Sequence, residues 1–193
     1  YTFVMRERFD EAETLLNEAV RLDPLSPLKN VWLAHLHTYT GAPEKGVSIM
    51  DRVLRSDPQV FVARYQRGLC HMTAGNLREA ASDFDEAIAS FGRVILPVAL
   101  RGVVHAFSGE TESARQILEE LRLRATEEYV DPYYLFTLRL SIDGFDAAFP
   151  YLEQMLEVRS FLVGYLRVVQ RYRELRSDPR FMNALRTVWP DDF

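Results

Sequence analysis

Three histidines recur at a spacing of 34 residues, and they are the first candidates for metal binding: His37, His71 and His105. Equivalent positions on neighbouring packed helices lie about 8–10 Å apart, whereas zinc sits about 2 Å from its nitrogen ligands. The three side chains therefore cannot share one ion, and His35 and His37 point to different faces of one helix. Cys70 is the only cysteine, so the chain forms no internal disulfide. We expect core or half-buried histidines, a buried structural thiol and no metal site.

The carboxylates form no arrangement that would support acid–base or nucleophilic catalysis. Glu119–Glu120 and Glu127–Glu128 lie in charged stretches, and Glu79 and Asp83 lie on a predicted helix of mixed charge. We interpret all of them as solvated helix faces. No glycine-rich phosphate loop accompanies them. The sequence therefore predicts a non-catalytic protein that needs no cofactor.

A repeat of 34 residues runs through the chain, and its elements must position any site. Small residues mark the repeat at Ala12, Gly46, Ala80, Ala114 and Ala148. A period of this length is typical of stacked helical hairpins. Such an array predicts a surface that binds partners.

Residues 76–88 show what the second helix of a hairpin contains. Their apolar side chains follow helical spacing, at Leu77, Ala80, Ala81, Phe84, Ala87 and Ile88. Gly75 ends the preceding helix, and Gly68 lies in the middle of that helix. A mid-helix glycine costs about 1 kcal/mol relative to alanine. Because Gly102 repeats Gly68 at the 34-residue step, we expect both to mark a close approach to the second helix, opposite Ala80 and its equivalents.

This pattern of small residues, aromatics and Gly-Asn turns resembles the tetratricopeptide repeat. The resemblance is strongest over residues 61–92 and good over 9–24, although Gly46 replaces the usual alanine and the turn glycine of the last repeat shifts to Gly144. It implies an all-α, right-handed α-solenoid, that is, an α-α superhelix. Its expected parts are a partial repeat at 1–26, repeats at 27–60, 61–94, 95–128 and 129–160, and C-terminal capping helices of the same domain at 161–193.

The C-terminal part carries a narrower resemblance. Leu175–Phe181, with the sequence Leu-Arg-Ser-Asp-Pro-Arg-Phe, is similar to the ending of tetratricopeptide segments in bacterial signalling proteins. In those proteins, the resemblance implies, the repeats follow a winged-helix, nucleotidyl cyclase or kinase domain. The chain begins at Tyr1 and not at methionine, so we expect it to be part of a larger protein. The alternative is that Asp178-Pro179 only starts a terminal helix of the kind that any solenoid needs.

The resemblance also implies that the first helix of each repeat lines a concave groove. We expect the following residues to form a partner-binding groove there: Leu28, Val31, His35, Val62, Tyr65, Leu69, Met72, Leu96, Val103, Tyr133 and Thr137. This surface is apolar and aromatic, which favours an amphipathic helix or an apolar peptide segment. It lacks the lysines and asparagines that would hold an acidic chaperone tail. A second subunit, an intramolecular segment or tight curvature could instead cover it.

Charge is distributed unevenly along the chain. Residues 161–186 contain six arginines and two carboxylates, a balance of +4, while the whole chain carries −5 and the rest therefore −9. Nucleic-acid binding would need a basic stripe, so we expect these arginines to pair within the molecule or to dock another domain. No run of about 18 apolar residues is present. The expected location is cytoplasmic, or periplasmic if a membrane helix precedes the chain.

The predicted function is a non-catalytic protein-interaction module. More narrowly, we expect the regulatory or sensory region of a larger bacterial signalling or transcription-regulating protein. One alternative is a stand-alone assembly scaffold or self-associating adaptor, which would form a homodimer. Another is a non-catalytic arm of a multidomain enzyme.

Overall fold

Helices form all the regular structure of residues 2–190, the part of the chain that the computed structural model describes. Their order is α1 (Thr2–Met5), α2 (Phe9–Leu22), α3 (Pro27–Tyr39), α4 (Pro43–Ser56), α5 (Phe61–Thr73), α6 (Leu77–Phe91), α7 (Ile95–Phe107), α8 (Thr111–Arg124), α9 (Pro132–Asp143) and α10 (Phe145–Glu157). The 3₁₀-helix η1 (Phe161–Gly164), α11 (Tyr165–Val168), the 3₁₀-helix η2 (Gln170–Ser177) and α12 (Pro179–Val188) follow. Successive hairpins pack against one another, and the prediction of an all-α, right-handed solenoid is confirmed.

The turn inside the hairpin of α5 and α6 depends on the repeated glycine. Gly75 has a φ of +81°, a left-handed conformation that residues with a side chain rarely adopt. This geometry lets the backbone N–H of Asn76 bond to the carbonyl of His71 at 2.9 Å, which satisfies a free carbonyl at the end of α5. Helix α6 begins immediately afterwards and runs back along α5.

The mid-helix glycine marks a close contact inside the hairpin, as predicted. A Cβ atom at Gly68 would lie 2.7 Å from Cε1 of Phe84 and 3.1 Å from Cβ of Asp83. The predicted counterpart, Ala80, is not among the nearest atoms, because Phe84 projects from α6 directly against Gly68. Gly102 approaches Ile117 in the next hairpin in a similar way. A Cβ atom at either position would therefore force neighbouring side chains to shift, which offsets the cost of glycine in helix propensity.

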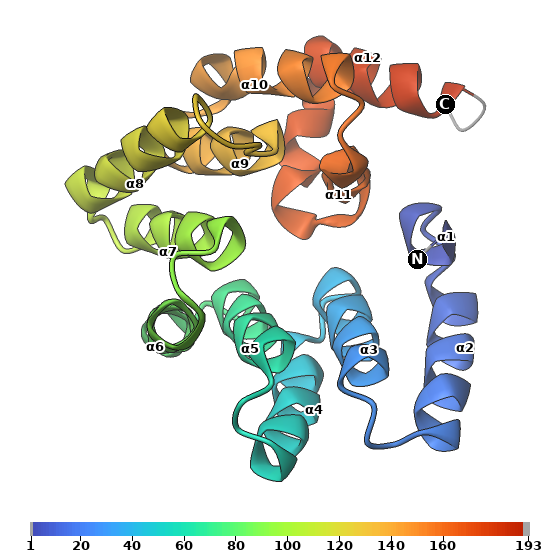
Figure 1. The fold of residues 1–193 in the computed structure, drawn as a ribbon. Helices are drawn as coiled ribbons and strands as arrows, with labels where there is room; N and C mark the ends of the chain where they lie inside the picture. Colours follow the sequence, from blue (N-terminus) through green and yellow to red (C-terminus); the bar gives the residue numbers. More distant parts are fainter. Residues whose placement is uncertain (1, 191–193) are drawn as a thin grey trace.

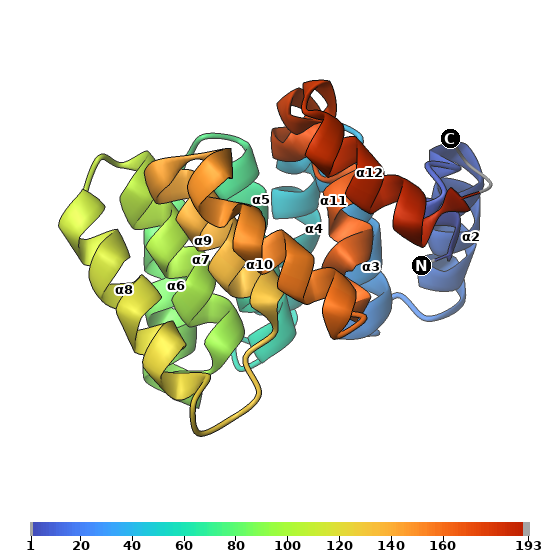
Figure 2. The same cartoon turned by 90° about the horizontal axis from the view of Figure 1, so that it is seen from above.

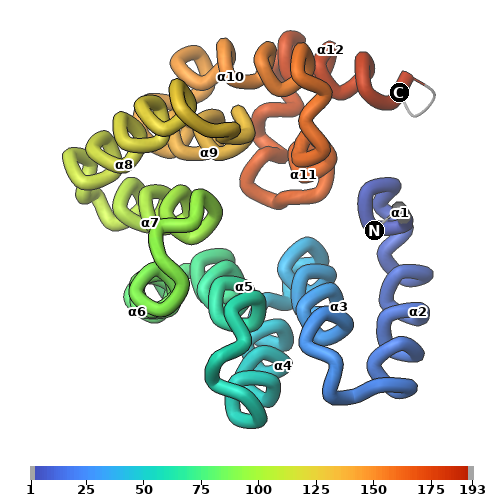
Figure 3. The backbone as a smooth tube through the Cα atoms, viewed as in Figure 1, coloured from blue at the N-terminus to red at the C-terminus, as the bar shows by residue number. Residues whose placement is uncertain are grey.

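The hairpins follow a curve (Figure 1). Helices α3, α5, α7 and α9 lie on the inner side of the curve, and α4, α6, α8 and α10 lie on the outer side. The backbone trace shows that the chain then turns back, so that α11 lies inside the curve (Figure 3). Helix α12 packs against α10 and covers the end of the array (Figure 2). Of the segment expected to cap the array, α12 has that position, whereas residues 161–178 lie on the concave side.

The returning C-terminal segment also reaches the start of the chain. Val168 of α11 lies in one apolar cluster with Val4, Met5, Leu36 and Tyr39, which come from α1 and α3. These contacts join elements that are more than 120 residues apart in the sequence. The curve is therefore closed by the C-terminal segment itself. Within residues 2–190, no helix is both long enough and apolar enough to cross a membrane.

Candidate functional site

A cavity of about 290 Å³ lies inside the curve of the array. Its outer wall comes from α3, α5, α7 and α9, and its inner wall comes from η1, α11, Val169 and η2. Aromatic side chains from these elements dominate the lining: Tyr39, Tyr65, Phe107, Tyr133, Tyr134, Tyr165 and Tyr172. An apolar cavity of this kind is the usual form of a binding site.

Most residues predicted to form the groove line this cavity, namely His35, Tyr65, Leu69, Met72, Leu96, Tyr133 and Thr137. The other four lie elsewhere. Val31 and Val103 are buried in the cores between helices, and Val62 packs beside the core of α3, α4 and α5. Leu28 is 59% exposed and lies outside the cavity wall. Partner binding by the whole set remains a prediction.

The C-terminal segment is held on the concave side by specific polar contacts. Tyr172 is fully buried, and its hydroxyl lies 2.8 Å from Oγ1 of Thr137 and 3.2 Å from the hydroxyl of Tyr133. The side-chain amide of Gln170 donates a hydrogen bond to the backbone carbonyl of Tyr39. An intramolecular segment therefore covers the groove, which is one of the alternatives that the sequence left open.

Tyr133, Tyr134 and His35 of the cavity are uncharged at neutral pH. Burial raises the pKa of Tyr134 to about 12 and raises the pKa of Tyr133 well above its ordinary value. Burial also lowers the pKa of His35 to about 4. Nδ1 of His35 is buried and has no hydrogen-bond partner among the described residues. These groups therefore act through hydrogen bonds and ring contacts, and not through charge.

The lowered pKa of His35 predicts a loss of stability in acid. The unfolded chain binds a proton at this residue near pH 6.5, whereas the folded protein binds it only near pH 4. Protonation of His35 in the unfolded chain therefore lowers the free energy of unfolding as the pH falls below about 6.5. The decrease is about 2 kcal/mol between pH 7 and pH 5. Urea denaturation at both pH values should show that His35→Phe loses about 2 kcal/mol less than the wild type. Equal losses in the two proteins would contradict this assignment.

Arg171 carries the only charged side chain in the cavity wall of the described chain. Its Nη2 donates hydrogen bonds to the carbonyl of Thr137 at 2.9 Å and to Oγ of Ser141 at 3.0 Å. Its guanidinium carbon lies 5.1 Å from the ring centre of Tyr172 and 5.4 Å from that of Phe107. Sequence reasoning counted Arg171 only as part of a basic segment, because its place in the cavity depends on the return of the chain.

Three of the other C-terminal arginines pair within the molecule, as expected, whereas Arg173 and Arg186 are exposed. Arg167 and Arg176 both reach Glu7, at 3.6 and 3.2 Å. Arg180 binds Asp146 on α10 at 2.6 Å. The basic segment is thus used to hold the C-terminal elements against α10 and the start of the chain.

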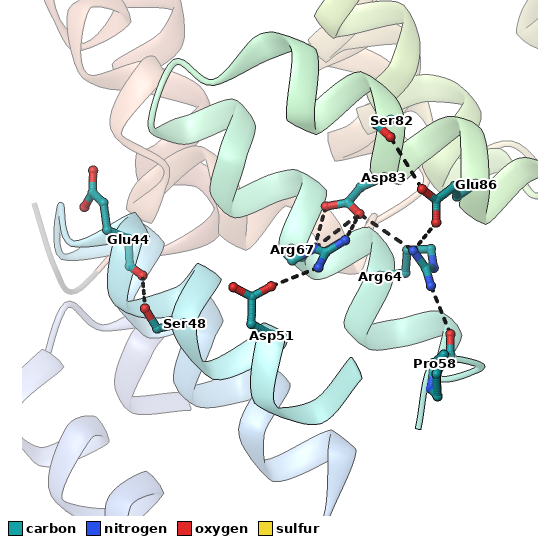
Figure 4. A network of polar contacts seen from close by, with 9 residues as sticks. All are labelled: Glu44, Ser48, Asp51, Pro58, Arg64, Arg67, Ser82, Asp83 and Glu86. Atoms are coloured by element: carbon teal, nitrogen blue, oxygen red, sulfur yellow. Dashed lines mark hydrogen bonds and ion pairs between the residues drawn. The ribbon is translucent and has the colours of Figure 1, made fainter. Parts of the chain in front are cut away.

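A buried carboxylate outside the cavity joins three helices (Figure 4). Asp83 of α6 is 2% exposed and accepts hydrogen bonds from Nε and Nη2 of Arg67 at 2.9 and 2.6 Å. Arg67 also donates to Asp51 of α4 at 2.9 Å, and Arg64 pairs with Glu86. The interpretation of Asp83 as part of a solvated face is therefore wrong, because α5 places two arginines over it. This network is structural and offers no reactive group to a ligand.

The remaining polar candidates have structural surroundings. Cys70 is buried, as predicted, and burial raises the pKa of its thiol to about 12, which makes it unreactive. His37 is buried, and His105 pairs with Glu110. Within the described residues, no three histidine, cysteine or acidic side chains are arranged to hold a metal ion.

Comparison with known proteins identifies the repeat. Residues 33–94 match the tetratricopeptide repeat family. These residues span most of α3, together with α4, α5 and α6. No curated protein matches the chain.

Several solved structures share the fold. A thermophilic TPR protein of Thermus thermophilus is 22% identical, with a TM-score of 0.66 over 93% of this chain and 91% of that chain. The Cut9–Hcn1 hetero-tetramer of the APC/C contains a chain that is 17% identical, with a TM-score of 0.61 over 96% of this chain and 38% of that chain. A tetratricopeptide repeat protein from Parabacteroides merdae ATCC 43184 is 17% identical, with a TM-score of 0.52 over 99% of this chain and 76% of that chain. The fold is that of a protein–protein interaction module. Residues 33–94 therefore match the tetratricopeptide repeat family by sequence, and the described chain as a whole shares the fold of solved tetratricopeptide repeat proteins.

Proposed function

We propose that this chain is a regulatory interaction module whose concave side binds an amphipathic helix or an apolar peptide segment of a partner. One observation carries the proposal: residues 161–178 of the chain itself occupy that side. Tyr165, Val169 and Tyr172 of this segment meet the same wall that contains most of the predicted groove residues. A partner segment of similar character would compete with residues 161–178 for this surface.

The local structure of residues 161–178 supports a segment that can be released. It consists of two 3₁₀-helices and a helix of a single turn. Hydrogen bonds in 3₁₀-helices are poorer than in α-helices, and helices this short are not stable alone. The segment should therefore open at a lower free energy than the long hairpins. The equilibrium between the open and closed states would regulate partner binding, because the two states expose different amounts of the concave side.

A synthetic peptide with the sequence of residues 161–178 tests this function. The tethered segment has an effective concentration of the order of millimolar, so the peptide should bind the wild-type chain weakly. Tyr172→Ala weakens the tethered copy, and this full-length variant should bind the peptide at least about tenfold more tightly.

The control is a peptide that carries the same tyrosine-to-alanine change, which should bind much more weakly. Fluorescence anisotropy of a labelled peptide measures both affinities. No saturable binding to Tyr172→Ala, with helicity retained by circular dichroism, would contradict a peptide-binding concave side.

A second candidate function is self-association as an adaptor. Leu22, Leu25 and Leu28 are exposed around the turn between α2 and α3, and Leu25 is 79% exposed. Exposed apolar residues that cluster in this way often mark an interaction surface. Analytical ultracentrifugation of the whole chain tests this candidate. A dimer that Leu25→Glu dissociates would support it, and a monomer throughout the micromolar range would contradict it.

We place this function in a larger bacterial signalling or transcription-regulating protein, in the cytoplasm, because of the similarity of Leu175–Phe181. Locally, these residues start the last helix: Asp178 accepts a hydrogen bond from the backbone of Arg180 at 2.8 Å, and Phe181 is fully buried. Intact mass and N-terminal sequencing of the native polypeptide test the assignment. A winged-helix, cyclase or kinase domain before Tyr1 would support it, and a native polypeptide without any of these domains would contradict it.

A further inference from the structure

The cavity differs from a simple contact between helices because it combines space, aromatic walls and one charge. Its volume of about 290 Å³ lies near the lower end of the range for small-molecule sites, about 300–1,000 Å³. Its aromatic rings come from α3, α5, α7 and α9 and from the C-terminal segment. Rings at these positions offer both faces and edges to a flat apolar molecule.

No carboxylate of the described chain forms an ion pair with Arg171. Seven other arginines in residues 2–190 are buried or half-buried, and each pairs with a carboxylate: Arg64, Arg67, Arg101, Arg124, Arg139, Arg167 and Arg176. Arg171 is also half-buried, but only the neutral oxygens of Thr137 and Ser141 accept its hydrogen bonds. A partly desolvated cation without an anion is unfavourable. An anionic group bound in the cavity would compensate this charge.

The walls also contain hydroxyl groups that are free to meet a ligand. Tyr65 and Tyr134 line the cavity, and neither hydroxyl makes a hydrogen bond to another of the described residues. Burial raises the pKa of both side chains, so the hydroxyls remain protonated. They are therefore available as donors to a polar substituent, while the rings around them supply apolar contact.

We propose that this cavity is a binding site for a small aromatic monocarboxylate, with the carboxylate paired to the guanidinium of Arg171 and the ring between the aromatic walls. Thr137 and Ser141 occupy Nη2 of Arg171, whereas Nε and Nη1 make no hydrogen bond to the described chain, so their N–H groups can donate charge-assisted hydrogen bonds to a carboxylate. A single guanidinium balances one negative charge, which favours a carboxylate over a doubly charged phosphate. The inference depends on the closed arrangement of residues 161–178, which supply Arg171, and it does not require that a partner peptide binds the concave side.

Calorimetric titration of the full chain with 2-naphthoate and with its neutral analogue 2-naphthamide tests the proposal. The wild type should bind 2-naphthoate with 1:1 stoichiometry and at least tenfold more tightly than 2-naphthamide. Arg171→Met should remove this preference while keeping the weaker affinity for the amide, which also shows that the cavity is intact. Arg171→Lys should retain part of the preference, because the positive charge remains but the several N–H donors of the guanidinium are lost.

Arg173→Met is the matched control, because Arg173 is exposed and lies in the same 3₁₀-helix. This variant should bind 2-naphthoate as the wild type does. The proposal is overturned if the wild type shows no saturable binding of 2-naphthoate. It is equally overturned if the preference for the carboxylate persists in Arg171→Met or disappears in Arg173→Met.

Discussion

Replacing Asp83 with asparagine is expected to lower the free energy of unfolding by about 3 kcal/mol. The carboxylate is 2% exposed and holds both Nε and Nη2 of Arg67. Asparagine has a similar shape, but it cannot neutralise the guanidinium. Removing one partner of a buried ion pair costs about 3–5 kcal/mol. The lower end of this range applies because Arg67 is 24% exposed and keeps its contact with Asp51.

The matched control is Asp85→Asn on the same helix. Asp85 pairs with Arg101 at 2.8 Å, but its side chain is largely exposed, so its loss should cost less than about 1 kcal/mol. Arg67→Met combined with Asp83→Leu should recover much of the stability, since the pair is then replaced by apolar side chains. Urea denaturation followed by circular dichroism measures all the variants. Equal losses for Asp83→Asn and Asp85→Asn would contradict a buried ion pair that joins α4, α5 and α6.

Replacing Tyr172 with alanine is expected to release residues 161–178 from the concave side. Truncation of a fully buried aromatic side chain costs about 3–4 kcal/mol. If this loss destabilises only the closed state of residues 161–178, the population of the open state increases about 10²–10³-fold. Tryptic cleavage after the arginines of the segment should accelerate by the same factor, because cleavage follows the open population when closing is fast. The circular dichroism of the hairpins should change little.

Two further variants isolate the contributions to this effect. Tyr172→Phe keeps the ring but removes the hydroxyl that contacts Thr137 and Tyr133, so its effect should be about 1–2 kcal/mol. Tyr129→Ala removes an exposed tyrosine before α9 and should leave the cleavage rate unchanged. If Tyr172→Ala accelerates cleavage no more than Tyr129→Ala does, the buried tyrosine does not hold the segment in place.

The hairpin array could be predicted from the sequence because its determinants are local and repeated. The step from Gly68 to Gly102 marks the close contact in two hairpins, and Gly75 marks a turn. The resemblance to the tetratricopeptide repeat placed Tyr65 and Tyr133 on the inner helices, where both line the cavity. It did not place Val103 correctly, because α9 packs over this side chain and takes it into the core.

The closure of the groove could not be predicted, because its contacts are neither local nor repeated. Residues 161–178 form short helical turns without a long apolar period, and Gln170 bonds to Tyr39 across 131 positions of sequence. The burial of Asp83 could not be predicted either. The mixed charge of its helix indicates a solvated face, and only the packing of α5 against α6 shows that Arg67 covers this carboxylate.

Native-state hydrogen exchange of the full chain is the measurement that decides whether residues 161–178 occupy the concave side as a releasable segment. Amides in this segment should exchange through an opening of lower free energy than the opening that exposes α5 to α8. Addition of a low concentration of denaturant should change the exchange of the segment less than that of the hairpins, because a local opening exposes less surface. Exchange of both regions with one common free energy and one common denaturant dependence would show that the segment does not open separately. The segment would then be a permanent part of the core.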